Sequence, residues 1–185
     1  FNAATYTGNA TARSITTGFQ PDWVWIKNRA ATENHSIFDS VRGVNKPIHP
    51  NLINAQTSQS DTLMSFNSNG FTLGDDSTNG EINSDSNTFG SWNWKAGTTG
   101  SGTTTGSGTG KAYSYSVSTT AGFSIVKYLG NGTAGHTIPH HLGVVPKMMV
   151  IKKLSGTGSW YVYSSVLGNK KAVYWNSTSA EDTEN

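Results

Sequence analysis

Lys27–Gly43 reads KNRAATENHSIFDSVRG, and Lys152–Gly168 reads KKLSGTGSWYVYSSVLG. Each residue of the second segment lies 125 positions after its counterpart in the first (152 − 27 = 125 and 168 − 43 = 125), with no gap. Repeated segments of this kind mark the unit that folds. The chain is therefore predicted to contain two copies of one structural module.

The similarity continues upstream of this segment. Trp23–Lys27 (WVWIK) lies at the same offset from Met148–Lys152 (MMVIK), and Tyr6–Asn9 (YTGN) resembles Tyr128–Asn131 (YLGN) after a three-residue shift in the loop between. The second copy reaches Asn185 before any counterpart of the later part of the first copy. We expect this copy to be incomplete, and the chain to be a fragment of a longer protein.

Composition favours an all-β protein and excludes several function classes. The chain has 34% hydrophobic and 13% charged residues, yet it holds six Trp, seven Tyr and seven Phe, enough large side chains for a core. Abundant Gly, Ser, Thr and Asn are typical of short strands joined by tight turns. The net charge of +2 is small and its basic residues are scattered, which predicts no nucleic-acid partner. No apolar run is long enough for a membrane span, so no membrane insertion is expected.

Five stretches carry strand signals. Trp23–Lys27, His35–Asp39 and Lys111–Ser118 alternate or are rich in β-branched and aromatic residues, and Phe89–Lys95 alternates large and small residues. Leu63–Leu73 reads as a hairpin whose Asn69-Gly70 pair supplies the positive φ angles of a tight turn. No stretch of about ten residues keeps a helical period free of Gly.

These signals divide the chain into three parts. Residues 1–97 are predicted to form a first β-sandwich module, residues 98–112 a Gly/Thr/Ser-rich flexible linker or exposed loop, and residues 113–185 the truncated start of a second, homologous module. The predicted fold class is all-β, with tandem antiparallel β-sandwich modules of a jelly-roll, concanavalin-like or immunoglobulin-like kind.

Four tryptophans are predicted to fill the core of the sandwich. Trp23 and Trp25 share one face of their strand, and Trp92 and Trp94 share one face of theirs. Paired stripes on two strands look like two walls of one core, although aromatic residues also stack on sugar rings. If exposed, Trp160, Tyr161 and Trp175 are the candidate glycan contacts.

The search for catalytic chemistry is negative. The chain has no G-x-S-x-G elbow and no H-E-x-x-H motif, and its closest approach to a phosphate-binding loop fails at Thr105 and Ala112. The chain has no cysteine, which excludes disulfides and thiolate metal sites. We therefore predict no catalytic residue, no cofactor and a non-enzymatic protein.

Two loops hold residue types that can bind metal ions. The loop Gly74–Asp85 is dense in oxygen ligands, so Asp75, Asp76 and Asp85 are the candidates for Ca²⁺, but its spacing is not that of an EF-hand and the same residues are ordinary in turns. His136, His140 and His141 form the one histidine cluster, which is read as a polar loop rather than a Zn²⁺ or Ni²⁺ site. The prediction is no metal in either loop.

Several strings together resemble a family of repeated domains in structural proteins of tailed bacteriophages, especially marine and cyanobacterial ones. They are GFQPDWVWIKNR (Gly18–Arg29), FDSVRG (Phe38–Gly43), SFNSNGFTLG (Ser65–Gly74), WNWKAG (Trp92–Gly97), AGFSIVKYLGNGTAGHTIPHHLGVVPKMMVIKK (Ala121–Lys153) and WYVYSSVLG (Trp160–Gly168). The resemblance implies β-sandwich domains in tail-fibre-like or other virion surface proteins, and it carries over no catalytic motif. It also implies a segment like Ser65–Gly74 and an aromatic strand after Asn185.

The functional expectation is a phage virion component, either a tail fibre or appendage, or a protein that decorates the capsid. Its expected partners are other virion proteins and copies of itself, with host surface polysaccharide as a further partner, and its expected place is the virion. The alternatives are a carbohydrate-binding module that recognises host glycan, and a cellular surface-layer or filament subunit located outside the cell or on its surface.

Overall fold

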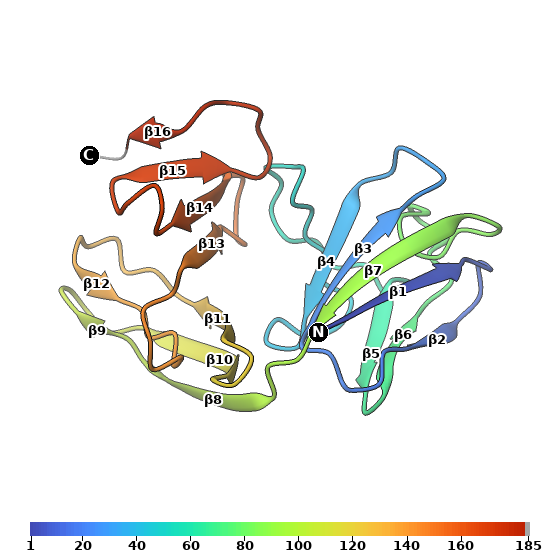
Figure 1. Cartoon of the computed structure of the whole chain (residues 1–185), viewed down its shortest axis with the longest axis horizontal. Coiled ribbons are helices and arrows are strands. Elements are labelled where there is room, and N and C mark those ends of the chain that lie inside the picture. The colour runs from blue at the N-terminus through green and yellow to red at the C-terminus, as the bar shows by residue number, and fades with distance from the viewer. Residues whose placement is uncertain (184–185) are drawn as a thin grey trace.

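The computed structural model describes residues 1–183 and contains strands and no helix in that range, which confirms the all-β prediction. Figure 1 shows a sandwich at the N-terminal side and a curved second half. The strands are β1 (Asn2–Thr7), β2 (Arg13–Thr16), β3 (Trp23–Asn28), β4 (His35–Asp39), β5 (Leu63–Asn67), β6 (Gly70–Leu73), β7 (Thr88–Trp94), β8 (Thr98–Thr103), β9 (Thr105–Gly106), β10 (Ala112–Ser118), β11 (Phe123–Tyr128), β12 (His136–Thr137), β13 (Met148–Lys152), β14 (Trp160–Ser164), β15 (Lys171–Tyr174) and β16 (Asp182–Thr183).

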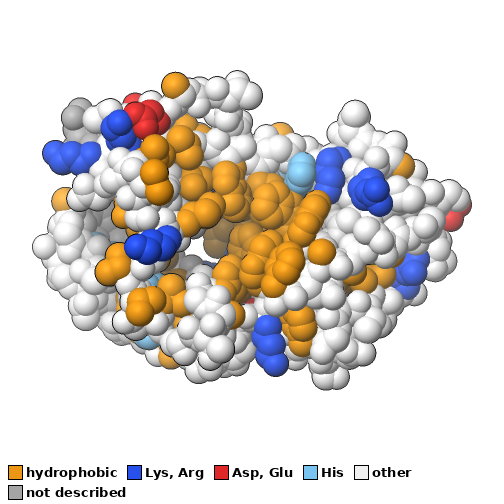
Figure 2. Space-filling view, in the orientation of Figure 1, with side chains coloured by type: hydrophobic (Ala, Val, Ile, Leu, Met, Phe, Trp, Pro, Cys, Tyr) orange, Lys and Arg blue, Asp and Glu red, His pale blue; other side chains and the backbone are white. Residues whose placement is uncertain are grey.

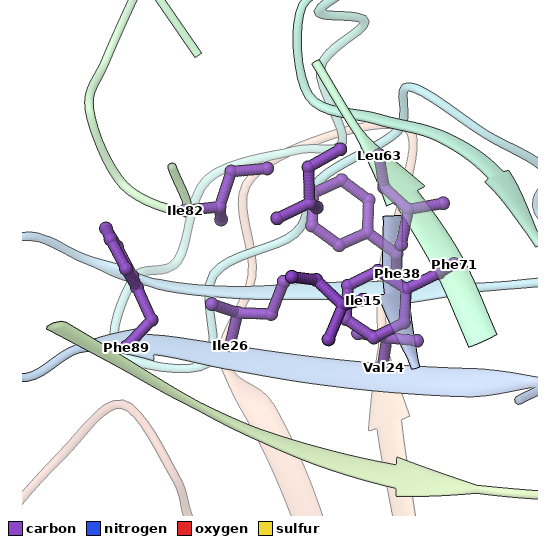
Figure 3. Close-up of a cluster of buried hydrophobic side chains, with 9 residues drawn as sticks. Ile15, Val24, Ile26, Phe38, Leu63, Phe71, Ile82 and Phe89 are labelled. Atoms are coloured by element: carbon purple, nitrogen blue, oxygen red, sulfur yellow. The ribbon is translucent and has the colours of Figure 1, made fainter. Parts of the chain in front are cut away.

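The first half is a two-layer sandwich. One sheet has the order β1-β7-β3-β4 and the other the order β2-β6-β5. The side chains between the layers form one cluster, shown in Figure 3. Its fully or nearly fully buried members are Ile15, Val24, Ile26, Phe38, Leu63, Phe71, Leu73, Ile82 and Phe89. Side chains alternate between the two faces of β3. Val24 and Ile26 therefore point into this core, while Trp23 and Trp25 point to the other face of the sheet.

The β5–β6 hairpin forms as predicted, but its glycine serves a different purpose. Asn67 pairs with Gly70, so Ser68 and Asn69 make the turn, and neither has a positive φ angle. Gly70 is instead the first residue of β6, where a Cβ atom would lie 1.9 Å from the carbonyl oxygen of Ile15 in β2. Glycine is required there by the close approach of a neighbouring backbone.

The repeat is reproduced in the pairing of the strands. In β3 and β4, Trp23 pairs with Asp39 and Lys27 pairs with His35. The residues 125 positions later pair in the same register in β13 and β14, where Met148 pairs with Ser164 and Lys152 with Trp160. The likeness extends past the predicted segment. Ile37 forms an isolated bridge with Ile48, and their counterparts Val162 and Val173 pair in β14 and β15.

The turn after this hairpin is also repeated. The amide of Gly43 donates to the carbonyl of Asp39 at 3.1 Å, and the amide of Gly168 donates to the carbonyl of Ser164 at 3.1 Å. Both glycines have positive φ angles, +88° and +92°. A helix-like turn closed by glycine in the left-handed region therefore ends this unit in both copies.

The Gly/Thr segment is exposed along most of its length, but it forms strands rather than the flexible linker or exposed loop that the composition predicted. Residues 98–103 form β8, which pairs with β10 over six residues, and Thr104 is buried. Glycines alternate along β8, and each lies under an aromatic ring of β10: a Cβ atom on Gly100 would lie 2.6 Å from the hydroxyl of Tyr115, and one on Gly102 would lie 2.8 Å from that of Tyr113. Tyrosine rings cover the bare backbone, so a strand forms where the composition indicated a loop.

The second half has a different sheet arrangement from the first. Its sheets have the orders β11-β10-β8 and β13-β14-β15-β16, and β12 and β9 form a short separate pair. In the first half β7 lies between β1 and β3, whereas no strand of the described residues lies between their counterparts β11 and β13. A second layer corresponding to β5 and β6 is also absent from the described part of this half.

Candidate functional site

The principal candidate surface is the face of β13 and β14 that corresponds to the core face of the first half. We call it the open face and define it as Met149, Ile151, Tyr161 and Tyr163. Met149 is 40% exposed and Ile151 46%, whereas their counterparts Val24 and Ile26 are both 0% exposed. The same strand in the same register thus buries its apolar side chains in one copy and presents them to solvent in the other.

The open face forms one wall of a shallow hollow. His140, Val145 and Pro146 approach from the preceding loop, and Asn169, Lys171 and Ala172 from the β14–β15 side. Tyr161 also packs edge-on against Tyr174, with ring centroids 5.0 Å apart. Aromatic and aliphatic side chains rimmed by a histidine, an amide and a lysine make a surface suited to contact with another molecule.

The four tryptophans predicted as the sandwich core lie elsewhere. Trp23 pairs with Trp94 and Trp25 with Trp92 on adjacent strands of one sheet, so they share a single face rather than forming two walls. That face is the outer one, and Trp92 is 38% exposed. The prediction failed because β3 is apolar on both faces, and alternation alone does not tell which face meets the second layer.

The outer tryptophan face contacts the second half of the chain. Trp25 lies 5.3 Å from Trp175, and Trp175 stacks on Trp160 at 5.7 Å between ring centroids. Phe123 of β11 packs against Trp94 at 6.0 Å. Figure 2 shows hydrophobic side chains gathered where the molecule is hollowed between the two halves.

Trp160 is a structural residue of this interface. It is 2% exposed, and its indole Nε1 donates to the backbone carbonyls of His49 at 2.9 Å and Leu52 at 3.1 Å. It is therefore not the exposed glycan contact that the sequence suggested. Trp175 is half-buried in the same cluster, and Tyr161, 44% exposed, is the one of the three candidates that meets the condition of exposure.

A buried polar junction also joins the two halves. Asp22 accepts hydrogen bonds from the hydroxyls of Ser40 at 2.7 Å and of Ser116 in β10 at 3.1 Å, and from the amide of Ala96 at 2.8 Å. The amide of Gly97 donates in turn to the hydroxyl of Ser116 at 3.0 Å. The carboxylate thus fixes the point where the chain leaves the sandwich.

The three aspartates considered as Ca²⁺ ligands make different contacts and do not converge on one site. Asp76 is buried, and its Oδ2 accepts from the amides of Ile82 at 2.6 Å and Asn83 at 2.8 Å. Burial raises the pKa of Asp76 to about 6, against the lowering effect of those two bonds. Asp75 and Asp85 are exposed and bond to neighbouring serine hydroxyls. Within residues 1–183, no three acidic or histidine side chains are grouped as metal ligands.

The histidines of the second half do not converge either. His136 Nδ1 lies 2.7 Å from the side-chain amide of Asn131, and His140 Nδ1 accepts from the amide of Leu142 at 3.1 Å. His141 stacks on the ring of Tyr115 at 3.8 Å, with a φ angle of +59°. This stacking packs the histidine loop onto the sheet of β8, β10 and β11.

The sequence did not reveal the open face, although one signal for it was present. Met149 and Ile151 were seen as part of the repeat, but their exposure depends on which strands lie over them. The signal is a difference in side-chain size between the two copies. Ser36 is 1% exposed in the first copy, and its counterpart in the second copy is the much larger Tyr161, which does not fit an equally buried position.

None of the described residues forms a helix long and apolar enough to cross a membrane. Comparison with curated proteins gave no match, and comparison with solved structures gave none. One family model, described as a domain of unknown function (DUF7483), matches residues 1–185. Because this match spans both copies of the repeat, the chain belongs to the DUF7483 family.

Proposed function

We propose that this protein is a non-enzymatic structural component of a tailed-phage virion, in a tail fibre or appendage or on the capsid surface, and that it acts by assembly. The observation that carries the proposal is the repeated hairpin, whose two copies pair in the same register. Within the described residues the second copy also presents Met149 and Ile151 to solvent. An exposed apolar surface built on a rigid sheet is typical of a contact between proteins.

The placement of polar side chains supports assembly over catalysis. Arg42 is buried and bonds to Asp39, to the carbonyl of Ile37 at 3.0 Å and to Gln56 at 3.2 Å. Glu81 is buried and accepts from Ser36 at 2.8 Å and Asn34 at 3.0 Å. Charged groups of this kind, which elsewhere act in catalysis or ligand binding, here hold loops of the sandwich in place.

The virion assignment draws on the family resemblance of the sequence strings and on the repeated architecture. A repeated module offers more than one surface for contact, and many weak contacts made together give avidity without a tight individual site. Copies of the same chain and other virion proteins are the partners that fit this arrangement.

The direct test is to look for the protein in purified particles. Phage particles from a host culture are purified on a density gradient, and their proteins are identified by mass spectrometry, with immunogold labelling to place the chain on capsid or tail. We expect the chain to co-purify with capsid and tail proteins in a fixed ratio. Its absence from particles, together with a gene neighbourhood of secretion functions, would favour the surface-layer or filament alternative.

A carbohydrate-binding role is the second candidate, favoured by the exposed ring of Tyr161 beside the polar side chains of His140 and Lys171. Aromatic rings beside polar groups suit stacking on sugars. A host glycan array tests it: Tyr161→Ala should abolish binding and Tyr161→Phe, which keeps the ring, should retain it. No binding of the unaltered protein to any host polysaccharide would contradict this second role.

A further inference from the structure

β8 has a free edge that lacks the features by which edge strands avoid pairing with other chains. It stands last in the sheet order β11-β10-β8, at the rim of the second half in Figure 1, and five of its six residues are exposed. Edge strands are commonly protected by charged residues, proline or a bulge. Between Lys95 and Lys111 the chain holds no charged residue and no proline, and β8 pairs with β10 without a break in register. The edge is therefore open to another strand.

Alternate residues of β8 face this edge. The amide of Thr104 donates to the carbonyl of Lys111 at 2.8 Å, in the direction of β10. Because the hydrogen-bonding direction alternates along a strand, the even-numbered residues of β8 face β10 and the odd-numbered residues face the free edge. Thr99, Ser101 and Thr103 thus present amides and carbonyls that pair with no strand of residues 1–183.

Two neighbouring features set the limits of this edge. β12 lies on the same side further along the chain, where Thr137 pairs with Thr105 of β9, so a strand added to β8 must end beside Thr103. In the first half β7 lies beside β1, the counterpart of β11. A counterpart of β7 therefore belongs at the β11 end of this sheet, which is the end opposite to β8.

The sequence of β8 is the same in both directions. Thr98–Thr104 reads TTGSGTT, with Ser101 at its centre. In an antiparallel pair of two such strands, a two-fold axis at Ser101 sets threonine opposite threonine and glycine opposite glycine. Ser101 then pairs with itself and Thr99 with Thr103 of the second copy, and all of these residues face the free edge. The edge is thus complementary to itself.

We propose that β8 pairs antiparallel with β8 of a second copy of this chain, about a two-fold axis at Ser101. The pairing joins two β11-β10-β8 sheets into one continuous sheet. A two-fold axis sets each residue near its own kind, so a charged strand would repel itself, whereas β8 carries no charge. This inference rests on the assembly proposed above, and it names the partner and the surface that binds it.

Both faces of β8 suit this pairing. On one face, a Cβ atom on Gly100 would lie 2.6 Å from the hydroxyl of Tyr115, and one on Gly102 would lie 2.8 Å from that of Tyr113. Glycine opposite glycine leaves room for these hydroxyls at the seam between the two copies. On the other face, threonine and serine hydroxyls stand opposite one another, at the cross-strand spacing that allows hydrogen bonds.

Single cysteines test the partner and the register together, because the chain has no cysteine of its own. Ser101→Cys places two thiols on the axis, in a pair whose Cα atoms lie about 5.5 Å apart, which is within disulfide range. In Thr99→Cys the two thiols are four residues apart along the strands, roughly 13 Å. With oxidised glutathione, Ser101→Cys should form a covalent dimer at least about tenfold faster than Thr99→Cys. A mixture of Thr99→Cys and Thr103→Cys should form the mixed dimer.

A charge on the axis tests the same contact without cross-linking. Sedimentation equilibrium of the unaltered chain should show a dimer with a dissociation constant on the order of 10–100 µM, since the paired strands are short. Ser101→Lys brings two ammonium groups together and should weaken the dimer by about tenfold or more. Thr109→Lys, at an exposed residue of the loop after β9, adds the same charge and should leave the dimer unchanged. Equal urea unfolding of both lysine variants checks that the fold is kept.

Three results would overturn the inference. One is a chain that stays monomeric up to about 1 mM. Another is equal cross-linking of Ser101→Cys and Thr99→Cys. The third is a dimer that Ser101→Lys does not weaken, which would place the contact between copies on another surface. Each concerns self-association alone, so the presence of the protein in purified particles is judged independently.

Discussion

The two copies of the repeat share backbone pairing and differ in what covers them. β3–β4 and β13–β14 pair in one register, yet Ile26 is 0% exposed and Ile151, its identical counterpart, is 46% exposed. Local sequence thus determines the hairpin, while burial is decided by strands that are distant along the chain. The hairpin is a scaffold, and its face is free to become either core or contact surface.

The largest expected effect is a difference in stability between variants of two equivalent isoleucines, one in each copy of the repeat. Ile26→Ala removes a fully buried side chain and leaves a cavity between the layers, so it should lower the free energy of unfolding by about 2–5 kcal/mol. Ile151→Ala makes the same chemical change on the open face, where surface substitutions cost within about 0.5 kcal/mol. Urea unfolding of both variants measures the difference, and equal losses would show that the open face is covered in solution.

Part of this fold was predictable because the information is local. The alternation of β3 and the β-branched and aromatic content of β4 identified those strands. The hairpin of β5 and β6 was also predicted, although its turn lies at Ser68 and Asn69 rather than at Asn69 and Gly70. The repeat further predicted that β13 and β14 would copy β3 and β4. For the strands of the first half, the pattern lies within a few residues of the strand that it predicts.

The rest required knowledge of partners. β8 looked like a linker because its strand depends on the rings of Tyr113 and Tyr115, which lie more than ten residues away. Trp25 looked like core because both faces of β3 are apolar. The open face escaped notice for the same reason, since exposure is a property of the whole arrangement of sheets.

The second prediction concerns the pH dependence of stability that arises from the buried Asp76 of the first half. The pKa of Asp76 is raised from 3.8 to about 6, so the folded state holds a proton that the unfolded chain has lost between those values. Stability from this group is therefore greatest below about pH 4 and declines as pH rises to about 6, by on the order of 2 kcal/mol.

Asp76→Asn should flatten that decline, because the amide oxygen still accepts from the backbone and carries no charge. Urea unfolding at a series of pH values measures it, with the exposed Asp75→Asn as the matched control. If the free energy of unfolding fell equally with pH in both variants, the raised pKa of Asp76 would not be the cause of the decline.

The third prediction tests the strand that replaces the expected linker. Gly100→Ala places a Cβ atom 2.6 Å from the hydroxyl of Tyr115, so the ring or the strand must shift, at about 1–3 kcal/mol. Gly130→Ala is the control, since no atom lies within 4 Å of its Cβ position and its φ angle is not positive. If both variants unfold at the same urea concentration, the rings do not pack on β8 in solution.

The smallest expected effect probes the contact between the two halves. Trp160→Phe keeps an aromatic ring against Trp175 but removes the indole N–H, which leaves the carbonyls of His49 and Leu52 without that donor. The loss should be about 1–2 kcal/mol, because a carbonyl deprived of a buried donor retains a second lone pair for other contacts. Tyr161→Phe, on the opposite face of β14, should change stability by less than about 0.5 kcal/mol. Unfolding followed by tryptophan fluorescence measures both variants. A larger loss at Tyr161 than at Trp160 would reverse the assignment of faces, placing the contact between the halves on the open face and the free surface on the tryptophan side.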